Sequence, residues 1–158
     1  MKYELLVDSR PNEVVIALLR DKQLLELHKE PIGTKFSVGD VFLAKVKKII
    51  TGLNATFVDV GYEKDGFLHY LDLGIKFKTF QKFTERNMAG KLNTASLRNF
   101  KHEPDIDKSG SINDVLNSGN QILVQVAKEP ISTKGPRLTT EITIAGRYMV
   151  LVPFSNKV

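Results

Sequence analysis

The amino-acid sequence lacks the features that mark several large classes of protein. It contains no cysteine, which excludes a disulfide framework and any metal site built on thiolates. No apolar run approaches the roughly 18 residues that a membrane-spanning helix needs, and the opening segment, MKYELLVDSR, has no apolar signal region. We therefore expect a soluble, cytoplasmic protein that does not enter a membrane.

Catalytic and metal-binding motifs are missing as well. The three histidines do not have the spacing of metal ligands (His28, His69, His102). No serine lies in a nucleophile-elbow motif, and the glycines form no phosphate-binding loop. The one tight acidic cluster, at residues 103–107, lacks the glycine and the terminal glutamate of a calcium-binding loop. We therefore expect no catalytic residue and no cofactor in this chain.

The basic excess of the sequence lies in one stretch. The net charge is +5, and residues 75–103 alone hold seven basic and two acidic side chains, interleaved with four phenylalanines. This composition is typical of a surface that contacts phosphates and stacks bases. A solvated insertion that its phenylalanines pack against the protein is the alternative, and both interpretations stay open. The seven basic residues are Lys76, Lys78, Lys82, Arg86, Lys91, Arg98 and Lys101; the first four form a candidate secondary RNA contact, the basic patch.

The dominant period of the hydrophobic pattern is two, which predicts a mainly β protein. Runs at 3–8, 13–19 and 23–27 are separated by turn residues and predict a three-stranded antiparallel meander. Five further strands, between Gly39 and Thr140, are of the number and length that close a small OB-fold barrel. Its long insertion falls between the third and fourth strands, and residues 112–117 are expected to form a helical turn. The five strands are expected at 41–50, 54–60, 65–70, 121–127 and 137–140.

Several blocks of sequence carry a resemblance. The blocks VGD, KVKKII, GLNATFVDVG, DGFLHY and SGNQILVQV resemble the RNA-binding OB-fold of the ribosomal protein S-one type. The whole chain resembles the N-terminal part of ribonuclease E/G family endoribonucleases. That wider resemblance rests on FVDVGYEKDGFL (57–68), TKGPRLTT (133–140) and IAGRYMVLVP (144–153).

The resemblance implies a domain organisation. Residues 1–36 would be a partial RNase H-like meander completed by later sequence, 37–140 the OB-fold domain with a basic insertion at 75–108, and 141–158 the start of a sensor for the RNA 5′ end. In that family, magnesium-binding acids and a zinc-linking cysteine pair lie further along the chain. The resemblance thus implies an inactive fragment of a homo-oligomeric, magnesium-dependent endoribonuclease that contains structural zinc and acts in RNA processing and decay.

Two phenylalanines are the main candidates for contact with RNA. By alternation, Phe57 shares a face of its strand with Ala55 and Asp59, and Phe67 shares a face with His69. An OB-fold binds a nucleic-acid strand across its second and third β-strands. Phe57 and Phe67 could therefore form a stacking platform, with His69 as a third π surface or as a hydrogen-bond donor to phosphate. Spacing alone favours the alternative, in which the rings fill the barrel core. The resemblance favours stacking, because both positions match aromatics that stack on RNA in the family.

A lysine in a turn is the other candidate. Lys134 lies in a Thr-Lys-Gly-Pro turn, where Gly135 would let the backbone approach a phosphate closely. The resemblance matches Lys134 to a lysine that contacts RNA, whereas an exposed lysine in a turn by default serves only solubility. Lys128 and Arg137 flank it as further candidates.

Two functions from different classes therefore remain open. One is the single-stranded-RNA-binding part of an endoribonuclease; the other is a free-standing RNA-binding module, such as a translation factor or an RNA chaperone. Residues 1–35 and the strand expected at 147–154 lie outside the barrel, which favours the enzyme.

Overall fold

The structure, a computed structural model, describes residues 1–31, 36–92 and 100–155. The chain divides into two compact units, Met1–Lys35 and Phe36–Val158. Arg98, one of the seven residues of the basic stretch, lies outside the described residues.

The first unit is the expected antiparallel meander. It consists of β1 (Tyr3–Ser9), β2 (Glu13–Arg20) and β3 (Gln23–Pro31), with β2 in the centre. The two-residue turn between β2 and β3 has both residues at positive φ, which matches the twist of a hairpin. Leucines of the outer strands are about half exposed on both faces of this sheet. The RNase H-like assignment of the meander stays a prediction.

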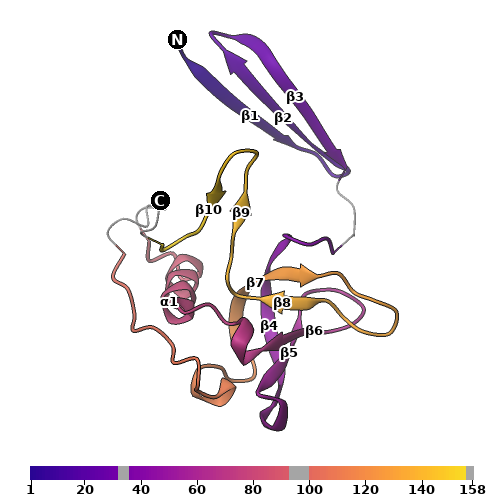
Figure 1. The fold of residues 1–158 in the computed structure, drawn as a ribbon. Coiled ribbons are helices and arrows are strands. Elements are labelled where there is room, and N and C mark those ends of the chain that lie inside the picture. Colours follow the sequence, from indigo (N-terminus) through magenta and orange to yellow (C-terminus); the bar gives the residue numbers. More distant parts are fainter. Residues whose placement is uncertain (32–35, 93–99, 156–158) are drawn as a thin grey trace. The chain divides into compact units, whose positions relative to one another are not determined.

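The second unit contains the predicted five-stranded barrel (Figure 1). The strands close in the order β4-β5-β6-β8-β7, and β7 pairs back onto β4. All neighbours are antiparallel except β6 and β8. The mainly β class and the OB-fold barrel are therefore confirmed. The strands are β4 (Val41–Ile50), β5 (Ala55–Asp59), β6 (Gly66–His69), β7 (Gln121–Lys128) and β8 (Arg137–Thr139).

Alternating side chains of these strands fill the barrel. Val58 on β5, Leu68 on β6, Val124 on β7 and Leu138 on β8 have no exposed surface. Gly66 is required beside Leu138, because a β carbon there would lie 2.5 Å from a methyl carbon of that leucine. Each inward position fixes its neighbours on the outer face, so the core determines which side chains the barrel presents to solvent.

The connection between β6 and β7 contains a helix that the sequence analysis did not predict. It carries η2 (Tyr70–Asp72), α1 (Phe77–Met88) and η3 (Ile112–Asp114), the last in place of the longer turn expected at 112–117. Phe77, Phe80 and Thr84 recur at helical spacing, and Gly90 follows the helix at a φ of +64°. The helical spacing is therefore present in the sequence. It was not interpreted as a helix, because a mixture of lysine and phenylalanine is equally typical of an irregular RNA-binding surface.

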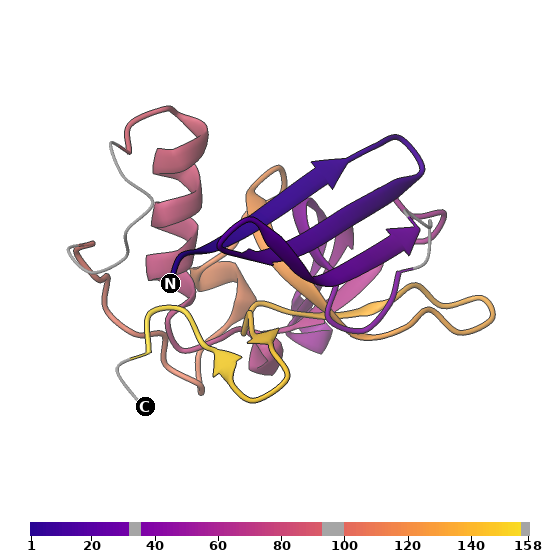
Figure 2. The ribbon, with the colours of Figure 1, turned by 90° about the horizontal axis from the view of Figure 1, so that it is seen from above.

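The final segment packs against this helix. A short hairpin of β9 (Ile144–Ala145) and β10 (Val150–Leu151) replaces the longer strand expected at 147–154. After it, the buried ring of Phe154 contacts Phe80 edge to face at 4.8 Å between centroids. In both views α1 and the β7–β8 loop (129–136) lie at opposite ends of the second unit (Figures 1 and 2).

Tyr70 ties the insertion to the barrel. Its ring is 2% exposed, and its hydroxyl donates a hydrogen bond to the backbone oxygen of Asp107 at 2.5 Å. Burial, aided by the negative charges of Asp107 and Asp114, raises the pKa of Tyr70, so the hydroxyl stays protonated and can donate.

Removal of this hydroxyl tests the contribution of its hydrogen bond to stability. We expect Tyr70→Phe to lower the free energy of unfolding by ~1 kcal/mol, because the buried side chain loses the hydrogen bond between its hydroxyl and the backbone oxygen of Asp107. Tyr148→Phe is the matched control, since that ring is 85% exposed and should leave stability unchanged. Urea unfolding of both variants measures the difference, and equal midpoints would contradict the assignment.

Candidate nucleic-acid interface

Phe57 and Phe67 lie on the outer face of the barrel. They are directly paired across β5 and β6, and their rings meet edge to face with centroids 5.8 Å apart and planes 67° apart. Both side chains are half-buried, while their strand neighbours Val58 and Leu68 are completely buried. The alternative that places these rings in the core is therefore wrong, and the predicted alternation is confirmed.

The two rings line an open hollow of about 870 Å³, which we call the aromatic hollow. Five of the six candidate RNA-contacting residues of the sequence analysis gather there: Phe57, Phe67, Lys128, Lys134 and Arg137. Sequence reasoning missed Lys64 and Asp65, which line it from the β5–β6 loop, and Thr133, beside Lys134. The only hint for Lys64 and Asp65 was their position just before β6.

A backbone contact holds the two loops of the aromatic hollow together. A β carbon on Gly135 would lie 2.0 Å from the carbonyl oxygen of Asp65, so only glycine fits. Next to it, the N–H of Phe67 donates to the carbonyl of Pro136 at 2.8 Å. Gly135 therefore admits the backbone of the chain's own β5–β6 loop, and its role in the approach of a phosphate stays a prediction.

Three lysines of the aromatic hollow have ammonium groups without an acidic partner. Lys64, Lys128 and Lys134 are exposed, and none forms an ion pair with any residue that the structure describes. The backbone of Lys134 closes a tight turn with Ile131, through hydrogen bonds of 3.0 and 3.2 Å. The turn therefore fixes the backbone of Lys134 and leaves its charge in solvent.

The acidic residue of the aromatic hollow is already paired. The carboxylate of Asp65 accepts a hydrogen bond from Lys47 at 2.8 Å, and this contact raises the pKa of Lys47. The charge of Asp65 is thereby balanced within the protein, so the three lysines without acidic partners dominate the field that an anion meets there.

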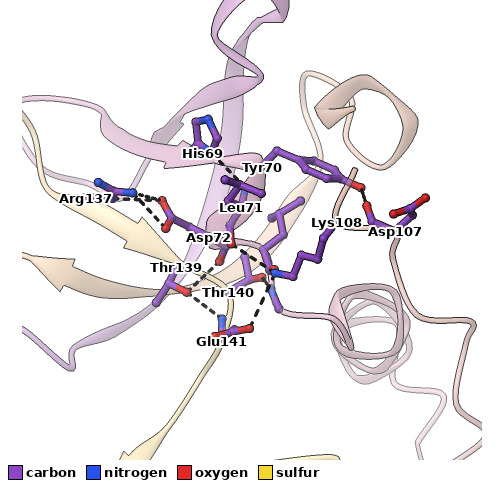
Figure 3. A network of polar contacts seen from close by, with 12 residues as sticks. His69, Tyr70, Leu71, Asp72, Asp107, Lys108, Arg137, Thr139, Thr140 and Glu141 are labelled. Carbon is purple, nitrogen blue, oxygen red and sulfur yellow. Dashed lines mark hydrogen bonds and ion pairs between the residues drawn. The ribbon is translucent and has the colours of Figure 1, made fainter. Parts of the chain in front are cut away.

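Arg137 is held by a partner that the sequence did not reveal. Its Nε and Nη2 donate to the two carboxylate oxygens of Asp72 at 3.1 and 3.2 Å, a two-pronged ion pair that Figure 3 shows. Asp72 is 65 residues away in the sequence, and no local pattern connects them. The guanidinium is thus fixed in orientation and its charge is largely balanced, in contrast to the three lysines.

His69 lies beside the aromatic hollow and does not line it. It shares the outer face of β6 with Phe67, but its Nδ1 accepts a hydrogen bond from the N–H of Leu71 at 3.0 Å, which caps η2 (Figure 3). In the neutral ring the proton is therefore on Nε2, which is available as a donor.

The basic patch is largely engaged within the insertion. Lys76 pairs with Asp105 at 2.8 Å, Lys82 pairs with Glu103, and Arg86 lies over the ring of Phe100. The contact with Lys82 lowers the pKa of Glu103.

Lys78 is exposed and, among the described residues, has no ion-pair partner. Three of the four phenylalanines of the insertion, Phe80, Phe83 and Phe100, pack with Phe154. These contacts favour the interpretation of a packed, solvated insertion, well separated from the β7–β8 loop (Figure 2).

The acidic and histidine side chains do not gather into a metal site where the structure describes them. Within residues 1–31, 36–92 and 100–155, no group of three histidine, aspartate or glutamate side chains is arranged to hold a metal ion. No helix in the described part of the chain is long and apolar enough to cross a membrane.

Substitution at Gly135 tests the contact between the loops. Gly135→Ala should lower the free energy of unfolding by about 1–3 kcal/mol, because the added methyl group overlaps a backbone oxygen that cannot move independently. Gly52→Ala is the control, since a β carbon added there would have nothing within 4 Å. Thermal melting that is unchanged in both variants would show that the loops do not touch.

Comparison with known proteins identifies the family. No family model matches the chain. The chain is 33% identical over 155 residues to ribonuclease G of Haemophilus influenzae and 32% identical over 158 residues to ribonuclease G of Escherichia coli, covering 98% and 100% of this chain. It is 36% identical over 124 residues, 78% of its length, to a ribonuclease E/G-like protein of Porphyra purpurea. The chain spans 28% of each ribonuclease G and 19% of the Porphyra protein. Similarity at this level along its whole length means that the chain belongs to the ribonuclease E/G family.

Proposed function

We propose that the aromatic hollow binds single-stranded RNA, as part of an endoribonuclease that acts in RNA processing and decay. The observation that carries this proposal is the paired rings of Phe57 and Phe67 on an outer barrel face, next to three lysines without acidic partners. Aromatic faces stack on bases and lysines contact phosphates, which together bind a single strand without reading its sequence. Membership of a family of ribonucleases supports RNA as the ligand.

The angle between the rings favours unpaired RNA. Because the two planes are inclined by 67°, two bases stacked on them cannot stay parallel to each other as they are in a duplex. The strand must present splayed bases, which only single-stranded segments do readily. Lys134 and Lys128 would then contact phosphates at the edge of the hollow, and Asp72 would keep Arg137 in a fixed position beside Phe67.

Cleavage of RNA belongs, in this proposal, to other parts of the parent enzyme. The described residues contain no cluster of acids that fits magnesium, and the sequence has no cysteine for a zinc link. We propose that the magnesium-dependent activity and the structural zinc lie outside this chain, in a parent enzyme that is a homo-oligomer. The similarity to ribonuclease G includes residues 1–35 and those after the barrel, which favours the enzyme over a free-standing RNA-binding module.

Truncation of the rings tests the binding surface. Phe57→Ala and Phe67→Ala should each weaken binding of an oligouridylate by about 1–3 kcal/mol, the usual worth of one stacked base. Lys134→Ala should weaken binding through loss of a phosphate contact. Fluorescence anisotropy measures the dissociation constants of the three variants.

Leu68→Ala provides the matched control for folding. It removes a completely buried side chain from the same strand as Phe67 and should cost ~2–5 kcal/mol of stability, whereas truncation of the half-buried rings should cost much less. If all three binding variants held RNA as tightly as the parent, the surface would be on another face of the barrel.

Activity provides a separate test. The purified chain should bind single-stranded RNA and leave it intact in magnesium, because its described residues contain no acids arranged to hold the metal. Denaturing gels of a labelled RNA measure cleavage, with a full-length ribonuclease G as the positive control. Magnesium-dependent products from a preparation free of contaminants would refute the assignment of cleavage to other parts of the enzyme.

A further inference from the structure

A single row of side chains crosses the outer face of the barrel. Lys48 on β4 pairs with Phe57 on β5, Phe57 with Phe67 on β6, Phe67 with Arg137 on β8, and Arg137 with Lys128 on β7. Directly paired residues on neighbouring strands point to the same face of a sheet. The aromatic pair therefore lies between Lys48 on one side and Arg137 with Lys128 on the other.

A β-bulge places Lys48 in this row. Val46 pairs with Val58 inside the barrel, and strict alternation would turn Lys48, two residues later, inward as well. The register shifts between Val46 and Lys48, so that Lys47 is the extra residue and Lys48 returns to the outer face opposite Phe57.

Bonds around the bulge keep this arrangement in place. The hydroxyl of Thr56 donates to the carbonyl of Lys48 at 2.9 Å, and the hydroxyl of Ser118 donates to the carbonyl of Lys47 at 2.8 Å. The side chain of Lys47 is engaged with Asp65, as described above. Lys48 is exposed, and no described residue forms an ion pair with it.

We propose that Lys48 is a further RNA-binding residue, which contacts a phosphate on the side of Phe57 away from Arg137. This inference rests on the proposed function of the aromatic hollow and extends its surface onto β4, which the hollow itself does not include. The bound strand then crosses the barrel strands from β4 toward β8. Three strand spacings separate Lys48 from Arg137, about 14 Å, and the two rings occupy the positions between them.

The neighbouring charges on β4 support this choice. Lys45 is also exposed, but it pairs with Asp59, which brings an acidic residue to its side. The carboxylate of Asp59 is engaged by the N–H of Gly61 at 2.9 Å, on the end of β5 away from His69. Lys48 is directly opposite an aromatic ring, and Asp59 is only its diagonal neighbour, so its ammonium group is the one on β4 best placed for a phosphate of a stacked nucleotide.

The salt dependence of binding tests the inference. Lys48→Gln should reduce the slope of log affinity against log salt concentration by about 0.7, the value for one phosphate contact on a single strand. This equals about a fivefold change in relative affinity for each tenfold change in salt. Lys48→Arg, which keeps the charge, should bind like the parent. The probe is a labelled oligouridylate of about twelve nucleotides, titrated by anisotropy over a range of potassium chloride concentrations.

Two control variants remove one lysine charge at positions away from the proposed phosphate contact. Lys45→Gln lies on the same strand beside Asp59, and Lys22→Gln lies in the exposed turn between β2 and β3; both should keep the slope of the parent. If the parent binds and Phe57→Ala weakens binding, but Lys48→Gln matches these controls, the extension onto β4 is wrong and the aromatic hollow stands. If the parent itself does not bind the oligonucleotide, the proposed function fails and the inference fails with it.

Discussion

The pairing of β8 with β6 is the contact on which the rest of the second unit depends. It is short, a single parallel pair between Phe67 and Arg137, reinforced by the bond from Phe67 to Pro136 and by the contact of Gly135 with Asp65. Because β8 also pairs with β7, this contact closes the barrel. It also brings Lys128, Lys134 and Arg137 to the aromatic pair, so the closure of the core and the assembly of the candidate site have the same physical cause.

Ion pairing divides the lysines of this basic protein into two groups. Lys47, Lys76 and Lys82 each contact a carboxylate, and these pairs tie loops to neighbouring elements. Lys48 and the three lysines of the aromatic hollow have no such partner among the described residues. A phosphate that approaches Lys48 or Lys128 therefore does not compete with a carboxylate of the described residues, whereas Lys76 and Lys82 of the basic patch are already paired with acidic side chains. Local composition left open whether the basic patch contacts RNA, and the distribution of ion-pair partners favours the barrel.

The meander and the barrel differ in how far they bury their apolar side chains. The barrel buries one face of each strand completely, as Val58 and Leu68 illustrate. In the meander, Leu5 and Leu6 on adjacent positions of β1 are both more than half exposed, so both faces of that sheet present apolar surface. A sheet with two apolar faces is typical of a layer covered on both sides; the RNase H-like assignment of the meander stays a prediction.

The sequence by itself determined the strands of the meander and of the barrel, because alternation in a strand is a local property. It left open whether Phe57 and Phe67 face the core or the solvent, and the burial of Val58 and Leu68 in the tertiary structure decided this. It also indicated the family, since the sequence blocks that carry the resemblance (57–68, 133–140 and 144–153) are continuous stretches that need no structure to be recognised. It did not reveal α1, although Phe77, Phe80 and Thr84 have helical spacing. Only the tertiary structure decided the contacts between distant segments: the pair of Asp72 with Arg137, the fit of Gly135 against Asp65, and the neutralisation of Lys76 and Lys82. The bulge that turns Lys48 outward belongs with these, because register is set by how two strands pack against a common core, and no single strand carries that information.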